Sequence, residues 1–232
     1  MQNSKPCPRI ITIDGPAGAG KSTLAKKLAV ALDLAYLDTG AMFRCLALAL
    51  RGNADIPATE LAKIFAELRF GLCAGRGSSG LLCRGLPPGE EIRSEEVALM
   101  ASRIAGNFAV RELMKSAQQE LGTQSSLVAE GRDMGTEVFP QATNKFFLEA
   151  SPEVRAMRRL KEMEARGQKQ DLAELVASIR KRDTQDRERA LAPLRPADDA
   201  IIIDTSRLDI DGVFKALMIH VRQSPQSPRA TG

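Results

Sequence analysis

The sequence predicts an α/β fold in which a five-stranded parallel sheet is flanked by helices. A chain of 232 residues, 44% hydrophobic and 27% charged, is long enough for one domain with a substantial core. Strand-like and helical segments alternate along it, which is typical of a parallel sheet. The predicted strands are short apolar segments at 10–13, 34–37, 124–129, 145–148 and 200–203.

The first strand leads into a glycine-rich loop at 15–22 that reads G-x-x-x-x-G-K-S, and a helix is predicted at 24–32. Glycines allow backbone conformations that a Cβ prevents, so several N–H groups can point at a polyphosphate. The positive end of the helix dipole adds to this field. Lys21 would neutralise the β- and γ-phosphates, and the Ser22 hydroxyl would reach a bridging magnesium ion. The motif predicts a nucleoside triphosphate site but does not by itself distinguish a kinase from a GTPase or a motor.

The second strand ends at Asp38, and a helix is predicted to follow from Thr39 and Gly40 to Leu50. Arg44 lies one turn into this helix, where it could bind an anion beside the phosphate loop. Judged by its type alone, however, an arginine there is more often a surface residue.

Glycine and proline interrupt the chain before a helix at 58–66. Short apolar runs separated by glycine, serine and proline turns then predict a small antiparallel insert at 67–92. Two helices are expected next, at 94–105 and 109–121. The third strand runs into Glu130, and the loop after it places Arg132 and Asp133 at the carboxyl edge of the sheet, where open parallel sheets bind ligands.

A helix start is predicted at Ser151, because a serine cap is followed by proline at the first helical position. This helix should run to 166 and stop at Gly167. Asp171 should cap a charged helix that reaches about 189, and a last helix is expected at 209–222. One row of three residues on the charged helix is spaced i, i+4 and i+7: Arg182, Asp186 and Arg189. Judged by charge pattern alone, such a row is more often a solvated helix face than a binding site.

Composition argues against several classes of protein. A net charge of +4, no tryptophan and one tyrosine do not favour a nucleic-acid binder. No apolar run is long enough to cross a bilayer, and the N-terminal residues lack the apolar core of a signal peptide, so we expect a cytoplasmic protein without a membrane partner. The four scattered cysteines should be free thiols, although Cys73 and Cys83 could face each other across a hairpin. The single histidine, His220, argues against a histidine-based zinc site or catalytic dyad.

With these motifs in place, the chain resembles the bacterial cytidylate kinases of the P-loop nucleoside monophosphate kinase family over about residues 9–222. The resemblance implies a P-loop NTPase fold with a monophosphate-binding region at about 39–122, which contains the β insert, and a short lid at about 158–170. Residues 1–8 and 223–232 would be flexible termini. The motifs that carry it are GPAGAGKST (15–23), LDTGAMFR (37–44), EIRSEEV (91–97), the pair Ser102 and Arg111, EGRDMGT (130–136) and RDTQDRERALAPL (182–194).

The resemblance implies transfer of the γ-phosphoryl group of ATP to CMP or dCMP, giving ADP and CDP or dCDP, with Mg²⁺ bound to ATP. The implied catalytic residues are Lys21, Arg132, Arg182 and Arg189. The implied ATP-binding residues are Gly15, Pro16, Ala17, Gly18, Ala19, Gly20, Lys21, Ser22 and Thr23, with Arg158 and Arg159 from the lid. The implied CMP-binding residues are Thr39, Gly40, Arg44, Ser102, Arg111, Arg132, Asp133, Asp186 and Arg189.

Within the CMP set, the resemblance assigns the cytosine edge to Ser102, Arg111 and Asp133. Arg44 and Arg132 would hold the monophosphate, and Asp186 would bind the sugar hydroxyls. Ser22 would be the magnesium ligand, with the phosphates and water, and Glu130 would act on the metal indirectly. Some residues depart from the family pattern: Glu130 stands where aspartate is usual, Phe43 replaces a common tyrosine, and Thr184 and Gln185 are less charged than in some relatives.

Three alternatives remain open at this point. A related kinase could use another acceptor, such as UMP, AMP or shikimate. A GTPase would need an N-K-x-D motif, but Asn144-Lys145 is followed by Phe146 and Phe147, so the aspartate is missing. A non-catalytic nucleotide sensor could share the fold. No long exposed apolar stripe is evident, so we expect a monomer, and Gly167 is a candidate hinge for closure of the lid.

Overall fold

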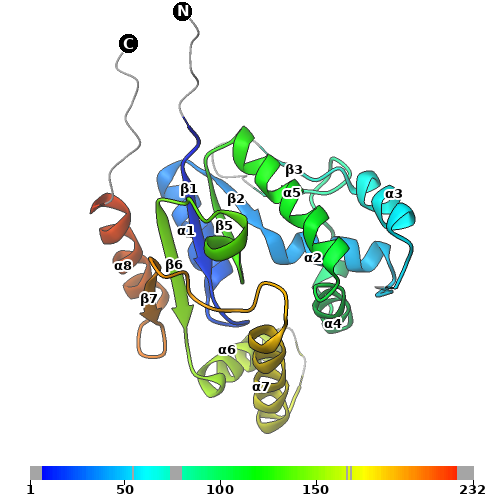
Figure 1. Ribbon diagram of the computed structural model, residues 1–232. Coiled ribbons are helices and arrows are strands. Elements are labelled where there is room, and N and C mark those ends of the chain that lie inside the picture. Colours follow the sequence, from blue (N-terminus) through cyan, green and yellow to red (C-terminus); the bar gives the residue numbers. More distant parts are fainter. Residues whose placement is uncertain (1–6, 54, 74–79, 166, 168, 224–232) are drawn as a thin grey trace, which may run out of the picture.

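The computed structural model describes residues 7–53, 55–73, 80–165, 167 and 169–223 (Figure 1). The predicted flexible termini lie almost entirely outside these residues. Within the described part of the chain, no helix is both long and apolar enough to cross a membrane.

The predicted five-stranded parallel sheet is confirmed, with strand order β2-β5-β1-β6-β7. The β-branched residues of β1 suit a strand that is buried on both faces, and Ile11 and Ile13 are fully buried. The register places Asp14 beside Gly131 and Phe147, so the carboxyl ends of the three central strands meet at one edge. The strands are β1 (Ile10–Asp14), β2 (Ala35–Asp38), β5 (Leu127–Gly131), β6 (Asn144–Glu149) and β7 (Ile201–Asp204).

Helices cover both faces of the sheet (Figure 1). One apolar cluster joins the sheet to α1 (Lys21–Leu32) and α8 (Ile210–Gln223). A second cluster joins the other face to a group of helices. These are α2 (Thr39–Ala49), α3 (Ala58–Leu68), α4 (Glu95–Ile104) and α5 (Phe108–Gln124).

The small antiparallel insert is also confirmed. Its strands are β3 (Gly71–Leu72) and β4 (Leu81–Leu82), and a short 3₁₀ helix at Glu90–Arg93 leads from it into α4. Cys73 and Cys83 do not form a disulfide across this hairpin, and Cys7 and Cys45 are free thiols as well.

The two helices predicted after β6 are α6 (Pro152–Glu164) and α7 (Leu172–Glu188), and they lie beyond the carboxyl end of that strand (Figure 1). Both predicted caps form: Ser151 Oγ accepts from the N–H of Val154 at 3.3 Å, and Asp171 Oδ1 accepts from the N–H of Glu174 at 3.0 Å. The two helices pack through a small apolar cluster of their own. They therefore form a separate helical pair beside the edge of the sheet where β1, β5 and β6 end.

One boundary differs clearly from the prediction. The strand expected at 124–129 begins at Leu127, because α5 continues to Gln124. Gly122 lies inside this helix, and a Cβ there would come within 2.6 Å of the Phe139 ring. By its intrinsic propensity, a glycine at position 122 would favour the end of the helix. The helix continues because it packs closely against Phe139 at this position.

Candidate active site

The phosphate loop has the strained backbone that its glycines predict. Gly15 has a φ of +143°, and a Cβ there would lie 2.2 Å from the carbonyl oxygen of Leu148. Gly20 has a φ of +89° and stands immediately before the first residue of α1. The loop therefore passes across the end of β6 and delivers the N-terminus of α1 to the carboxyl edge of the sheet, which favours anion binding.

Lys21 lies inside this loop and is only 6% exposed. Its ammonium group donates to the carbonyl oxygen of Pro16 at 2.8 Å. Burial and, to a smaller extent, the nearby charge of Arg132 lower the pKa of Lys21 to about 7, against the opposing charges of Glu130 and Asp14. A buried ammonium in this setting is poised to gain stabilisation from a bound polyphosphate.

Glu130, at the end of β5, is a hydrogen-bond acceptor for residues from three other elements. Its Oε2 accepts from Ser22 Oγ at 2.9 Å, and its Oε1 accepts from the Tyr36 hydroxyl. Its backbone oxygen accepts from Thr39 Oγ1 at 2.7 Å. Burial raises the pKa of Glu130, and the two hydroxyl donors and Lys21 oppose that rise.

A hydroxyl beside a carboxylate is a set of hard oxygen donors, and Mg²⁺ is commonly held by one or two such groups together with substrate phosphates. The described residues contain no cluster of three or more His, Cys, Asp or Glu side chains that could hold a metal without a substrate. The Ser22 hydroxyl and the Glu130 carboxylate therefore have the chemistry to bind a magnesium ion that a phosphate ligand carries with it.

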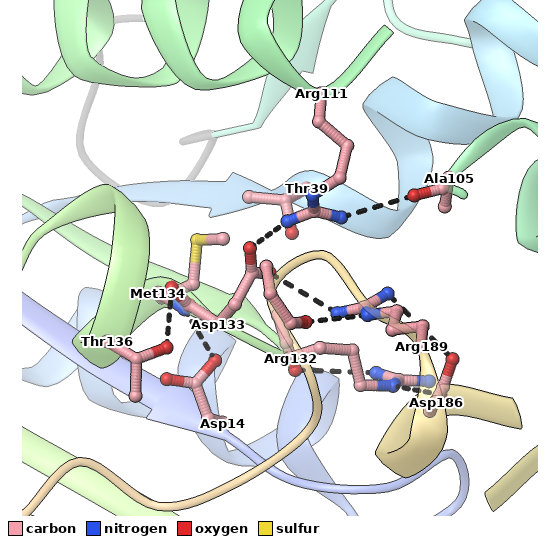
Figure 2. Close-up of polar contacts among 12 residues, drawn as sticks. Asp14, Thr39, Ala105, Arg111, Arg132, Asp133, Met134, Thr136, Asp186 and Arg189 are labelled. Atoms are coloured by element: carbon pink, nitrogen blue, oxygen red, sulfur yellow. Dashed lines mark hydrogen bonds and ion pairs between the residues drawn. The ribbon is translucent and has the colours of Figure 1, made fainter. Parts of the chain in front are cut away.

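The loop after β5 is held by Asp14. Its two carboxylate oxygens accept from the N–H groups of Met134 and Gly135, at 2.9 and 2.8 Å (Figure 2). These bonds fix the segment that presents Arg132 and Asp133. Burial nevertheless raises the pKa of Asp14 to about 7.

Asp14 should make stability depend on pH. Because its pKa rises from 3.8 to about 7 on folding, the folded protein keeps a proton that the unfolded chain loses between these values. Stability should then fall as pH increases from about 4 to 7, by up to about 4 kcal/mol from this group. Urea unfolding gives the free energy of unfolding of the wild type and of Asp14→Asn. The difference between the two free energies should change between pH 4 and 7 and should be constant below and above this range. A difference that is constant from pH 3 to 8 would contradict this.

Arginines and aspartates of this loop, of α5 and of the C-terminal end of α7 alternate in one network (Figure 2). Arg111 of α5 pairs with Asp133 and also donates to the carbonyl oxygen of Ala105 at 3.4 Å. Arg132 Nε donates to Asp186 Oδ2 at 2.9 Å. Arg189 forms ion pairs with both aspartates: its Nη2 lies 3.9 Å from Asp133 Oδ1, and its Nη1 lies 4.0 Å from Asp186 Oδ1. The structure thus brings together residues that are widely separated in the sequence.

Some of the arginines predicted for the site have buried guanidinium N–H groups without a hydrogen-bond acceptor in the described part of the chain. Among the described residues, the buried N–H groups of Arg44 Nε, Arg182 Nε and Arg189 Nη2 lack a hydrogen-bond partner. Burial and the charge of Arg132 lower the pKa of Arg182 to about 10. Unsatisfied buried donors cost about 1–3 kcal/mol each. Arg182 and Arg189 each lie close enough to Arg132 and Asp186 for the charges to interact, and their unsatisfied donors suit an anion with several oxygens.

The position of Arg44 follows from the start of α2. Asp38 caps this helix by accepting from the N–H of Ala41 at 2.8 Å, and its other oxygen lies 3.5 Å from Arg44 Nη2. Gly40 lies next to the guanidinium, and a Cβ there would come within 3.4 Å of Arg44 Nη1. The sequence LDTGAMFR therefore forms a capped helix start with the guanidinium of Arg44 packed beside the first turn.

A cavity of about 200 Å³ lies between α5, the loop after β5 and Leu191. Arg111 and Asp133 line it, together with Phe43 and Gln118. Gln118 is 1% exposed, and its Nε2 is unpartnered within the described part of the chain. Sequence reasoning missed Gln118, although its position seven residues after Arg111 puts both side chains on one helix face.

Arg155 was also missed, and it is the largest fully buried side chain. It forms a two-point ion pair with Asp183 of α7, and its Nη1 donates to the carbonyl oxygen of Ala17 at 3.1 Å. The same residue therefore ties the phosphate loop to both helices of the α6–α7 pair.

Three residues predicted for the site make other contacts or lie beside it. Arg158 donates to Thr205, with its Nη1 3.0 Å from Thr205 Oγ1, and Arg159 pairs with Glu95 of α4. In this arrangement both guanidinium groups are therefore engaged by other residues of the chain. Ser102 is half-buried on α4, one turn before the Ala105 carbonyl that accepts from Arg111.

Comparison with known proteins gives a consistent result. The family model described as Cytidylate kinase matches residues 11–223. A cytidylate kinase of Oleidesulfovibrio alaskensis is 54% identical over 211 residues, covering 90% of this chain and 96% of that protein. Cytidylate kinase 1 of Haemophilus influenzae is 42% identical over 216 residues, covering 92% of this chain and 94% of that protein. A solved shikimate kinase from Bacteroides thetaiotaomicron aligns with 92% of this chain and 98% of its own, at a TM-score of 0.47 and 17% identity, which is too distant to bear on activity.

Proposed function

This chain belongs to the cytidylate kinase family, and on that premise we propose that it transfers the γ-phosphoryl group of ATP to CMP or dCMP, giving ADP and CDP or dCDP. The observation that carries the proposal is the presence of buried guanidinium donors on Arg44, Arg182 and Arg189 without hydrogen-bond acceptors among the described residues. A monophosphate would supply those acceptors, and the loop would place ATP within reach of it.

On the donor side, the backbone of residues 15–22 would hold the ATP phosphates, with Lys21 against the β- and γ-phosphates. Magnesium would be held by Ser22 with the phosphates and water, and it neutralises charge on the transferred group. Glu130 would keep the Ser22 hydroxyl turned toward the metal site.

On the acceptor side, the arginines would bind and orient the monophosphate. Their planar groups offer two parallel donors to phosphate oxygens, which fixes direction as well as charge. Phosphoryl transfer passes through a loose transition state with charge on the equatorial oxygens, so positioning and neutralisation are the main tasks of the protein. Asp186, held by Arg132, would accept from the sugar hydroxyls. The proposed phosphate ligands are Arg44, Arg132, Arg182 and Arg189.

The base would occupy the cavity beside Arg111 and Asp133. Cytosine has an N4 amino donor next to the N3 and O2 acceptors, which suits a carboxylate beside a guanidinium. Uracil has a carbonyl in place of the amino group and would face Asp133 with a second acceptor. Gln118 offers a further amide donor to the same cavity.

Asp133→Asn should narrow the preference for CMP over UMP. The amide can turn its nitrogen toward the uracil carbonyl, while the contact of Asp133 with N4 is weakened. We expect kcat/KM for CMP to fall by about 100-fold relative to that for UMP, a difference typical of an unmatched buried hydrogen bond. Initial rates with both acceptors measure this ratio.

Glu137→Gln is the matched control for Asp133→Asn, because Glu137 lines the same cavity. Its CMP to UMP ratio should stay at the wild-type value. An unchanged ratio in Asp133→Asn would refute the role of Asp133 in base selection.

The reaction itself is tested by ADP release from Mg·ATP with CMP, dCMP, UMP, AMP, shikimate or no acceptor. Turnover with CMP and dCMP alone supports the proposal. Turnover with another acceptor would keep the fold and the phosphate loop but would reject the base-reading set. ATP binding without turnover on any acceptor would favour a nucleotide sensor.

The proposal includes a monophosphate-binding region at about 39–122 and a lid at about 158–170 that closes over the nucleotides, with Gly167 as a hinge. The positive φ of Gly167, +74°, suits such a role. It also includes a monomer that works in the cytoplasm without nucleic-acid or membrane partners. Light scattering coupled to size-exclusion chromatography tests the oligomeric state.

A further inference from the structure

Tyr36, Glu130 and Ser22 form a hydrogen-bonded series that ends at the phosphate loop. They come from β2, β5 and α1, and the two outer residues donate to different oxygens of the same carboxylate. Tyr36 is 3% exposed and Glu130 is 4% exposed, whereas Ser22 is exposed at the surface of the loop. One end of the series is therefore buried and the other is open to a ligand.

The carboxylate of Glu130 is fixed by these contacts. The backbone on which it stands is paired with β2, where Asp38 lies opposite Glu130, and its carbonyl oxygen accepts from Thr39. With the Tyr36 hydroxyl on Oε1, Oε2 is left to face Ser22. Without that hydroxyl, a buried carboxylate could turn toward the ammonium of Lys21, whose charge acts on it.

The orientation of the Ser22 hydroxyl decides whether it can bind a cation. A hydroxyl offers its lone pairs to a metal only when its hydrogen points elsewhere. Here the hydrogen is donated to Glu130 Oε2, so the lone pairs face away from the carboxylate. Contacts beyond the direct ligands commonly tune a metal site in this way.

We propose that Tyr36 is a positioning residue for Mg·ATP, acting through Glu130 on the Ser22 hydroxyl. This rests on the proposed function only in taking Ser22 as the magnesium ligand. A purely structural role for Tyr36 would affect stability but not the contribution of magnesium to ATP binding.

The test is Tyr36→Phe, which keeps the buried ring and removes the hydroxyl. ATP affinity is measured by calorimetry without any acceptor, once with Mg²⁺ and once with EDTA. We expect the affinity for Mg·ATP to fall about tenfold, the scale of one hydrogen bond to a charged group. The affinity for metal-free ATP and the KM for CMP should stay within about twofold of wild type, in keeping with sites that do not share a partner.

Two further variants separate the alternatives. Lys26→Met removes the cation that lies 5.5 Å from the centre of the Tyr36 ring but keeps the hydroxyl, so it should bind Mg·ATP like the wild type. In Ser22→Ala, adding Tyr36→Phe should cause no further loss, because the two residues act in series.

Equal weakening of ATP binding with and without Mg²⁺ in a folded Tyr36→Phe protein would overturn the proposal. So would full additivity with Ser22→Ala. These binding measurements need no acceptor, so they remain interpretable even if the wild type fails to phosphorylate CMP.

Discussion

Replacing Lys21 with methionine should lower kcat by about 100- to 1,000-fold, the usual cost of losing one charge-stabilising group in a transition state. The ammonium is the buried cation of the phosphate loop, and in the described structure its hydrogen bond goes to the carbonyl oxygen of Pro16. Steady-state rates with saturating ATP and CMP measure the effect.

The same substitution should not destabilise the protein in the absence of nucleotide. Burial already lowers the pKa of Lys21 to about 7, which means that the site disfavours its charge when no phosphate is bound. Methionine has a similar length without the charge, so the thermal midpoint of the nucleotide-free variant should equal or exceed that of the wild type. ATP should then stabilise the variant less than the wild type.

Lys26→Met provides the control, because Lys26 is exposed on the same helix. Its rate should match that of the wild type. Near-normal kcat in Lys21→Met would reject the role of the ammonium, and a lower midpoint in the nucleotide-free variant would show that Lys21 instead supports the loop structurally.

The second large effect is expected at Asp183. Its side chain neutralises Arg155, which is 1% exposed and also donates to Ala17 and Ala150. Asp183→Asn leaves the guanidinium buried without its counter-charge, and breaking such a pair costs about 3–5 kcal/mol. For a chain of this size, the thermal midpoint should drop by about 10 °C.

Urea unfolding gives the free energy directly. Glu153→Gln is a suitable control, since Glu153 pairs with Arg180 at an exposed position where both partners are solvated, and we expect no measurable change there. An Asp183→Asn protein as stable as the wild type would show that water or another group compensates Arg155.

Local signals in the sequence were sufficient for most of the fold. The apolar segments gave the five parallel strands, and Ser151 and Asp171 cap α6 and α7 as predicted. These signals are local because a helix cap, or the apolar pattern that indicates a buried strand, can be recognised from residues within a few positions of each other. The predicted end of α5, at residue 121, was wrong because the packing of Gly122 on Phe139 overrides the tendency of glycine to end a helix.

The phosphate loop was likewise determined by the sequence, since the spacing of its glycines, Lys21 and Ser22 is fixed along one stretch of chain. The end of the third predicted strand also placed Glu130, and after it Arg132 and Asp133, at the carboxyl edge of the sheet, because parallel strands align their carboxyl ends. For Ser102 and Arg111, spacing alone was uninformative and the family resemblance provided the roles.

Tertiary structure alone decided which side chains meet across long separations. Tyr36 reaches Glu130, Arg155 reaches Asp183, and Gln118 faces the cavity beside Asp133. No local pattern encodes these contacts, because the partners lie on different elements and come together only when the sheet and helices pack. Burial then makes them strong: a charge or hydroxyl removed from water must find its partner inside the fold, and the packing of whole elements determines what that partner is.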